Sequence, residues 1–169
     1  VQRDPLLHVV APVPARPKTV FIEVPVEARK AEVTCAKCNL RESCLIGTVP
    51  AGNLGRIENI VYARRRMKRG EQLIGAGDEF NSLYAIRSGF FKTSLVDGEG
   101  RDQVTGFFMG GELLGLDGLG TGRYNSSVTA LEDSEVCIMP YRLIEEIGRE
   151  VPALQRGLHT MLAREIVRD

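Results

Sequence analysis

The chain has 169 residues, of which 43% are hydrophobic and 26% are charged, as in an ordinary globular domain. Its 22 basic and 22 acidic residues cancel, whereas a dedicated nucleic-acid-binding domain usually has a basic excess. No apolar run approaches the roughly 20 residues that cross a bilayer, and no signal peptide is readable, so we expect a cytoplasmic protein without membrane contact. The chain begins at Val1 rather than Met, which indicates a fragment of a longer protein.

Residues 1–30 contain five prolines, a density that disfavours helix and indicates a flexible N-terminal leader. Residues 31–50 carry three of the four cysteines and form a segment of their own. The apolar positions 54, 57, 60 and 61 then predict a helix, which should be short because Gly52 and Gly55 weaken it.

Residues 51–150 are predicted to form the main domain, which is rich in short strands from residue 62 onwards. Alternating or apolar runs are separated by glycines, and Asp97 with Gly98 marks a hairpin turn. Many short strands with regular turn signals indicate an antiparallel sandwich or barrel. The predicted strands cover residues 72–74, 82–87, 90–96, 103–108, 127–130 and 135–139.

The chain becomes helical after Pro140. Residues 141–147 predict a short helix that closes near Gly148, and Pro152 is placed to begin a final helix that runs to Asp169. Spacings of three and four on this last helix define one apolar stripe, which can pack on the β-domain or pair with a twin helix. The stripe consists of Leu154, Leu158, Met161, Leu162 and Ile166.

The four cysteines can all serve one site. Cys35, Cys38 and Cys44 have the spacing C-x2-C-x5-C, and Cys137 lies far along the chain in a predicted strand. Thiolates are soft ligands that suit zinc or an iron–sulfur cluster. A four-cysteine zinc site commonly uses two close pairs, and here there is only one, so the spacing favours a cluster. A zinc site and unrelated buried thiols remain the alternatives.

The cysteines and three further motifs together resemble the cyclic-AMP-receptor/FNR superfamily of bacterial transcription regulators, and within it the fumarate and nitrate reduction regulators (FNR). The resemblance covers residues 35–169. The three motifs are Leu83-Tyr84-Ala85-Ile86-Arg87-Ser88-Gly89, Gln103-Val104-Thr105-Gly106-Phe107 and Gly111-Glu112-Leu113-Leu114-Gly115.

This resemblance implies a mainly β fold, an antiparallel double-stranded β-helix (a jelly-roll of cyclic-nucleotide-binding type), followed by a long dimerisation helix over residues 151–169. It implies a 4Fe-4S cluster on Cys35, Cys38, Cys44 and Cys137, which oxygen converts to a 2Fe-2S form. The intact cluster then favours a homodimer that binds DNA. A helix-turn-helix domain should follow the dimerisation helix, and we expect it to be absent from this chain.

The resemblance also implies roles for two groups of residues outside the cysteine site. Asp169 corresponds to an aspartate of the dimerisation helix, where like charges from two copies would oppose pairing. Val96, Gly100 and Arg101 lie at the hairpin that contacts RNA polymerase in the family. Arg101 stands where an acidic residue is expected, which departs from the family's pattern.

Two other features allow different functions. The family's cyclic-nucleotide site needs an arginine followed by serine or threonine, but Tyr124 and Asn125 stand there, with Arg123 one place away, so we expect a relic loop. The basic run at residues 64–69 is better explained as the solvated face of an edge strand than as a nucleic-acid contact. No nucleophile–base pair, phosphate loop or histidine cluster indicates an enzyme.

Overall fold

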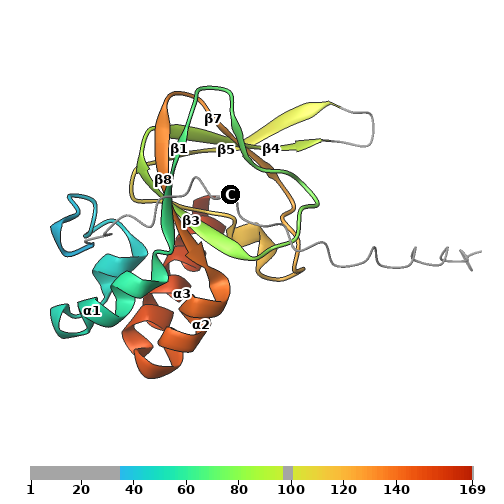
Figure 1. Cartoon of the computed structure of the whole chain (residues 1–169). Coiled ribbons are helices and arrows are strands. Elements are labelled where there is room, and N and C mark those ends of the chain that lie inside the picture. Colours follow the sequence, from blue (N-terminus) through green and yellow to red (C-terminus); the bar gives the residue numbers. More distant parts are fainter. Residues whose placement is uncertain (1–34, 97–100, 169) are drawn as a thin grey trace, which may run out of the picture.

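A computed structural model of the chain describes residues 35–96 and 101–168, and the leader at 1–30 lies outside these residues. Two four-stranded antiparallel sheets face each other (Figure 1), one in the order β1-β8-β3-β6 and the other in the order β2-β7-β4-β5. The predicted antiparallel β-roll is thereby confirmed. The strands are β1 (Ala63–Met67), β2 (Gln72–Ile74), β3 (Ser82–Ser88), β4 (Phe90–Val96), β5 (Asp102–Met109), β6 (Leu113–Leu114), β7 (Ser127–Ala130) and β8 (Ser134–Pro140).

The space between the two sheets is filled by apolar side chains from alternate strand positions. Phe91 of β4, Ile86 of β3 and Val136 of β8 are among them, and each is almost wholly buried. Because successive side chains on a strand point to opposite faces, the neighbours of these residues lie on the outer faces of the sheets. The interior of the roll is therefore a packed core.

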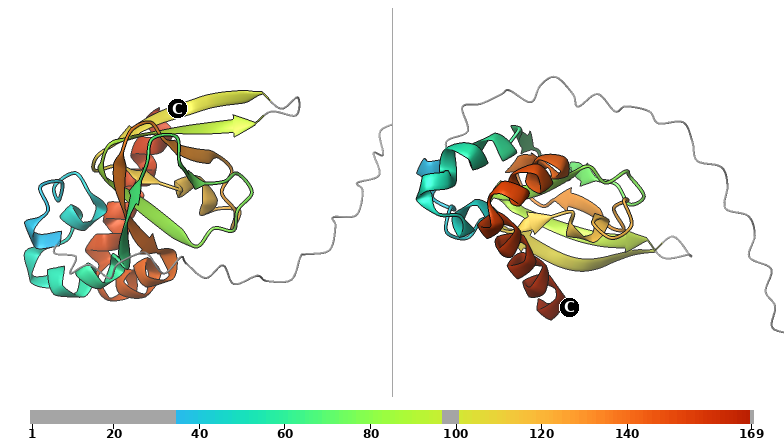
Figure 2. Two further views of the ribbon diagram at one scale, coloured as in Figure 1. Left: turned by 45° about the horizontal axis from the view of Figure 1, so that its top comes forward. Right: turned by 90° about the horizontal axis from the view of Figure 1, so that it is seen from below.

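A second core lies on the outer face of the β1-β8-β3-β6 sheet. Leu83 and Met139 project into it from the sheet and meet residues of the helices and of the N-terminal segment. Figure 2 shows these helices beside the roll, with the cysteine segment (blue to cyan) next to them. The helices are α1 (Leu54–Ile57), α2 (Tyr141–Glu150) and α3 (Pro152–Arg168), and the 3-10 turns are η1 (Cys35–Lys37), η2 (Leu45–Thr48), η3 (Ala51–Asn53), η4 (Glu58–Ile60) and η5 (Leu116–Gly118).

All six predicted strands are present, and helix α3 begins at Pro152 as predicted. The predicted end of the preceding helix near Gly148 is wrong, because α2 continues to Glu150. Gly148 is buried inside α2, and a Cβ there would lie 3.0 Å from Cγ of Gln155. This glycine allows α2 to approach α3 closely and does not end the helix.

The apolar stripe of α3 divides between two environments. Leu154 and Leu158 are buried within the protomer, and Met161 and Leu162 pack partly against the same core. Ile166 is 76% exposed. The first turns of α3 therefore attach it to the domain, and its last turns project outward. No helix in the described part of the chain is long and apolar enough to span a bilayer.

Candidate functional site

The three clustered cysteines lie on a tight loop that starts with Cys35 in η1 and ends with Cys44 at the start of η2. Backbone N–H groups hold the loop closed: that of Cys38 donates to the carbonyl of Cys35 at 3.1 Å, and that of Cys44 to the carbonyl of Leu40 at 3.0 Å. A Cβ at Gly47 would lie 1.8 Å from the carbonyl oxygen of Arg41, so only glycine fits there. The close approach of the Arg41 carbonyl to Gly47 makes the loop compact.

Two buried side chains attach this loop to the domain. Leu45 and Ile46 follow Cys44 directly in η2, and both are almost completely buried in the core that also contains Cys35. In the structure they are core residues that fix the position of Cys44.

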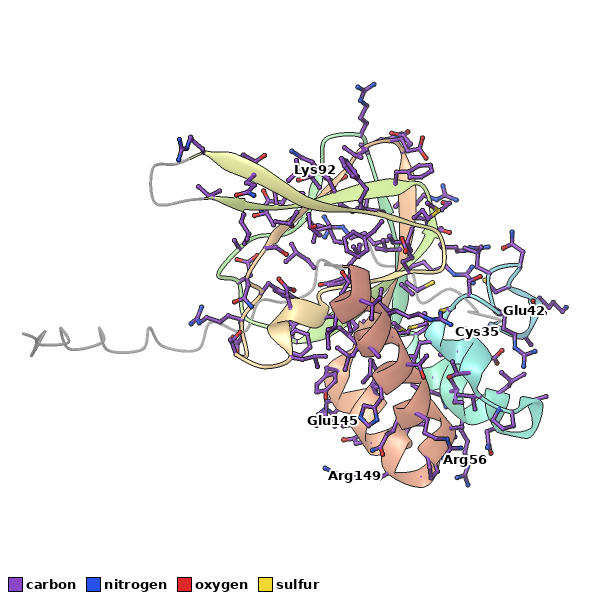
Figure 3. The ribbon with its side chains drawn as sticks, turned by 180° about the vertical axis from the view of Figure 1, so that it is seen from behind. Cys35, Glu42, Arg56, Lys92, Glu145 and Arg149 are labelled. Carbon is purple, nitrogen blue, oxygen red and sulfur yellow. The ribbon has the colours of Figure 1, made fainter. Side chains whose placement is uncertain are left out.

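The fourth cysteine, Cys137, lies in the central strand β8. It is in register with Arg64 of β1 on one side and with Ala85 of β3 on the other. Its neighbour Val136 faces the interior of the roll, so Cys137 faces outward, toward the N-terminal segment and the helices. Cys44 and Cys137 both pack against the outer core that includes Cys35. Figure 3 shows Cys35 at the junction of the cysteine segment with the rest of the domain.

The electrostatics of the thiols indicate that the four cysteines share one region. The pKa of Cys35 is raised to about 12, chiefly by burial and to a smaller extent by the charges of Cys137, Cys44, Glu58 and Cys38. Burial likewise raises the pKa of Cys44 to about 11, with contributions from Cys137 and Cys38. Cys35 and Cys44 therefore both lie close enough to Cys38 and Cys137 to sense their charges, and burial favours the neutral form of Cys35 and of Cys44.

The pKa of Cys137 is also raised, chiefly by burial. Arg64 opposes that rise, and Arg87 does so more weakly. Cys137 is thus the thiol of the site that lies next to basic side chains. Sequence reasoning treated Arg64 only as part of the basic run, because its place beside Cys137 depends on the register of β1 with β8.

The four thiols are the candidate ligands of this site, and a single ion and a multi-iron cluster would place them differently. Among residues 35–96 and 101–168, no three His, Cys, Asp or Glu side chains converge so as to hold one metal ion. A tetrahedral zinc site brings four donors to about 2.3 Å from one centre. A four-iron cluster gives each thiolate an iron of its own, so its sulfurs stand farther apart. The two kinds of site therefore differ in how far apart the donor sulfurs stand.

Two contacts join the cysteine loop to its surroundings. Ser43 lies against the turn between β5 and β6, where a Cβ at Gly111 would be 2.6 Å from the Cβ of Ser43. A small cavity of about 140 Å³ adjoins this contact and is lined by Ser43 and by Met161 and Arg164 of α3, among others. Beyond it, Thr48 of η2 touches α3 where a Cβ at Gly157 would lie 2.1 Å from Thr48 Oγ1. The cysteine segment is therefore in direct contact with α3.

The loop expected to be a relic of a nucleotide site is filled by the protein's own side chains. Oδ2 of Asp117 accepts hydrogen bonds from the backbone N–H of Asn125 at 3.0 Å and of Ser126 at 2.8 Å, and from the Ser126 hydroxyl at 2.8 Å. Tyr124 is buried, and its hydroxyl donates to the carbonyl of Ser82 at 2.8 Å. The Asp117 carboxylate thus occupies two backbone N–H donors and one hydroxyl donor of this loop, a role that sequence reasoning missed.

The remaining sequence candidates lie apart from the cysteines. The basic run does contain an edge strand, β1, but only part of it is solvated: the Arg66 side chain is 94% exposed, whereas Arg64 and Arg65 are half-buried. Val96 ends β4 and is 59% exposed, Arg101 is exposed, and Gly100 lies outside the described residues. Asp169 also lies outside them.

Comparison with known proteins agrees with this architecture. The family of the cyclic nucleotide-binding domain matches residues 64–150. The transcriptional regulatory protein btr of Bordetella pertussis is 37% identical over 135 residues, 80% of this chain and 56% of that protein. The fumarate and nitrate reduction regulatory protein of Escherichia coli K12 is 34% identical over 137 residues, 81% of this chain and 55% of that protein. The chain thus spans about half the length of these relatives.

Solved structures show the same fold. The catabolite activator protein of Thermus thermophilus has a TM-score of 0.59 and 23% identity, covering 68% of this chain and 55% of that one. The sensor domain of the transcriptional regulator DNR from Pseudomonas aeruginosa has a TM-score of 0.63 and 13% identity, covering 76% of this chain and 87% of that one.

The roll and the family match over residues 64–150 place the chain in the class of cyclic-nucleotide-binding-type domains. With its curated relatives, it belongs to the cyclic-AMP-receptor/FNR family of transcription regulators.

Proposed function

We propose that this chain is the sensory part of an oxygen-responsive transcription regulator, with an iron–sulfur cluster on Cys35, Cys38, Cys44 and Cys137. The observation that carries the proposal is that Cys44 and Cys137 pack against the core that contains Cys35, and that Cys38 is close enough to act on all three by its charge. The family membership supports it, because relatives named for fumarate and nitrate reduction align over most of the chain. A bound cluster would supply the oxygen-sensitive chemistry.

The chain's own residues would hold the cluster and position the loop that carries it. Cys35, Cys38 and Cys44 hold one side of the site on the loop, and Cys137 holds the other side on the roll. The buried thiols keep their protons in the metal-free chain, so cluster assembly requires that they release them to become ligands. Leu45 and Ile46 keep the loop against the domain while this exchange takes place.

The signal would pass from the cysteine loop to α3 through the contact between Thr48 and Gly157. Since Leu154 and Leu158 are already buried, we place pairing between two copies on Met161, Leu162 and Ile166. The charge of Asp169 would oppose this pairing, as the resemblance implies. Binding to DNA, and contact with RNA polymerase through the β4–β5 hairpin, belong to the longer parent protein under this proposal. We propose a cytoplasmic location and no enzymatic activity.

Anaerobic reconstitution with ferrous iron and sulfide tests the proposal. The expected product is brown, holds about four iron and four acid-labile sulfide ions per chain, and bleaches in air. It should sediment as a dimer before exposure to air and as a monomer afterwards. A colourless protein that binds one zinc ion per chain would refute the cluster.

A pair of variants on β8 makes the test specific. Cys137→Ser removes one ligand and should abolish the brown product. Met139→Leu lies on the same face of β8 and conserves volume, so it should still take up the cluster. Equal iron content in the two variants would exclude Cys137 as a ligand.

A further inference from the structure

The guanidinium of Arg64 has a buried donor with no partner. Its Nε is inaccessible to solvent and meets no hydrogen-bond acceptor among the described residues. A buried polar atom without a partner typically costs about 1–3 kcal/mol, so such atoms usually have a reason to be there. The one ligand candidate on the neighbouring strand, Cys137, is its register partner.

Register partners on antiparallel strands have side chains on the same face, with Cβ atoms about 4.5–5.5 Å apart. Arg64 is therefore directed to the outer face of the sheet, on which Cys137 also lies. This placement follows from the pairing of β1 with β8, which joins Ala63 to Ile138 at one end and Met67 to Ser134 at the other.

We propose that Arg64 is a positioning residue of the cysteine site, whose Nε–H donates to the sulfur of Cys137 when that sulfur is a metal-bound thiolate. This inference rests on the proposed function and deepens it. Arg64 already lowers the pKa of Cys137 by its charge and by a side-chain hydrogen bond. A thiolate is a better acceptor than a neutral thiol, so this interaction strengthens when the site is loaded, and the buried Nε gains a partner. The fixed positive charge also offsets the excess negative charge that four thiolates bring to the cluster.

Two other arginines near the site are less suited to this role. Arg87 also acts on Cys137, but it is engaged by Glu135 at 2.8 Å. Arg66 lies two positions along β1 on the same face, and its side chain is 94% exposed. Of the three, Arg64 alone combines a buried unpartnered donor with direct register to Cys137. Arg66 is consequently a matched control on the same strand.

The experiment compares Arg64→Gln, Arg64→Lys and Arg66→Gln, each reconstituted anaerobically beside the wild-type chain. Hydrogen bonds to cluster sulfurs and nearby positive charge favour the reduced state, so Arg64→Gln should shift the cluster's reduction potential to a more negative value. We also expect it to retain iron about tenfold less tightly in a chelator competition. Arg64→Lys keeps the charge but has no donor at the Nε position, so its potential should lie between the two. Arg66→Gln should match the wild type.

The outcomes separate this inference from the proposed function. If the wild-type chain takes up no iron and sulfide, the proposed function fails, and the inference fails with it. If the wild type takes up a cluster and Arg64→Gln has the same potential and iron retention, only the inference is overturned. A wild-type potential in Arg64→Lys would overturn the hydrogen bond. Urea denaturation of the metal-free variants identifies any variant that fails to fold. If Arg64→Gln fails to fold, the reduction potential of Arg64→Lys tests the hydrogen bond instead.

Discussion

Replacing Gly157 with alanine tests the contact between the cysteine segment and α3. A Cβ at this position would lie 2.1 Å from Oγ1 and 2.8 Å from Cβ of Thr48. Rotation of the threonine side chain cannot relieve the second contact, and its hydroxyl already donates to the carbonyl of Leu45 at 2.7 Å. Either η2 or α3 must therefore move.

The expected loss of stability follows from two opposing effects. Overpacking of a well-packed contact costs about 1–3 kcal/mol, whereas alanine in place of glycine favours a helix by about 1 kcal/mol. Because the clashing atoms would be very close and one of them is the Cβ of Thr48, we take the upper end of the overpacking cost. The free energy of unfolding should then fall by about 1–2 kcal/mol.

Urea denaturation of the metal-free chain measures this change. Gly55 of α1 is the control, because a Cβ there would meet nothing within 4 Å, so Gly55→Ala should stabilise the chain by about 0.5–1 kcal/mol. Adding Thr48→Ala to Gly157→Ala removes Oγ1 and should recover part of the loss. If Gly157→Ala stabilises the chain as much as Gly55→Ala does, the close contact between η2 and α3 is wrong.

Three further predictions concern the loop, the roll and the thiols. Gly47→Ala should prevent cluster uptake in anaerobic reconstitution, because the new Cβ would lie 1.8 Å from the carbonyl oxygen of Arg41; iron content equal to wild type would contradict it. Tyr124→Phe should lower the free energy of unfolding by about 1–3 kcal/mol, because it removes a buried hydroxyl bonded to the backbone of β3; an unchanged urea midpoint would argue against that bond. The metal-free chain should lose stability as the pH rises above about 9. Burial is the main cause that raises the pKa of Cys35 from 9.0 to about 12 and that of Cys44 from 9.0 to about 11. Above pH 9 the unfolded state therefore releases thiol protons that the folded state keeps, and this difference lowers the free energy of unfolding. Replacing both cysteines by serine should flatten this dependence in denaturation curves, and a slope that persists would assign it to other groups.

The strands were predictable because glycines mark their ends and apolar side chains alternate within them. β6 escaped prediction because it has only two residues, Leu113 and Leu114, whose pairing with β3 depends on the rest of the sheet. The end of α2 was misplaced for a different reason. Gly148 breaks helices by intrinsic propensity, but here the approach of Gln155 favours a residue without a side chain inside the helix.

The spacing of apolar residues identified the apolar stripe of α3, but this spacing does not indicate which residues pack against the stripe. Leu154 and Ile166 have the same spacing signal, yet one is buried in the protomer and the other is exposed. The side chains that cover Leu154 come from segments distant in sequence, such as η2. A one-dimensional pattern therefore cannot distinguish a domain core from a surface that pairs with another copy.

The sequence predicted the cysteine loop of the candidate site but not the surroundings of Cys137. The spacing of Cys35, Cys38 and Cys44 predicted that these three residues lie on one loop, because close spacing is itself a local property. The environment of Cys137 was not predictable, since Arg64 meets it only through strand register. Asp117 was missed because its hydrogen bonds to Asn125 and Ser126 depend on how the loop folds back on η5.

The two-sided environment of strand β8 affects how domains of this fold can diverge in sequence. Its alternate residues face two separate environments, with Val136 in the interior of the roll and Cys137 on the outer face. A mutation at one position leaves the packing around the other largely intact. Descendants of one ancestral roll can therefore exchange the chemistry on the outer face while the interior stays unchanged, so shared ancestry of the fold does not dictate which stimulus a given member detects.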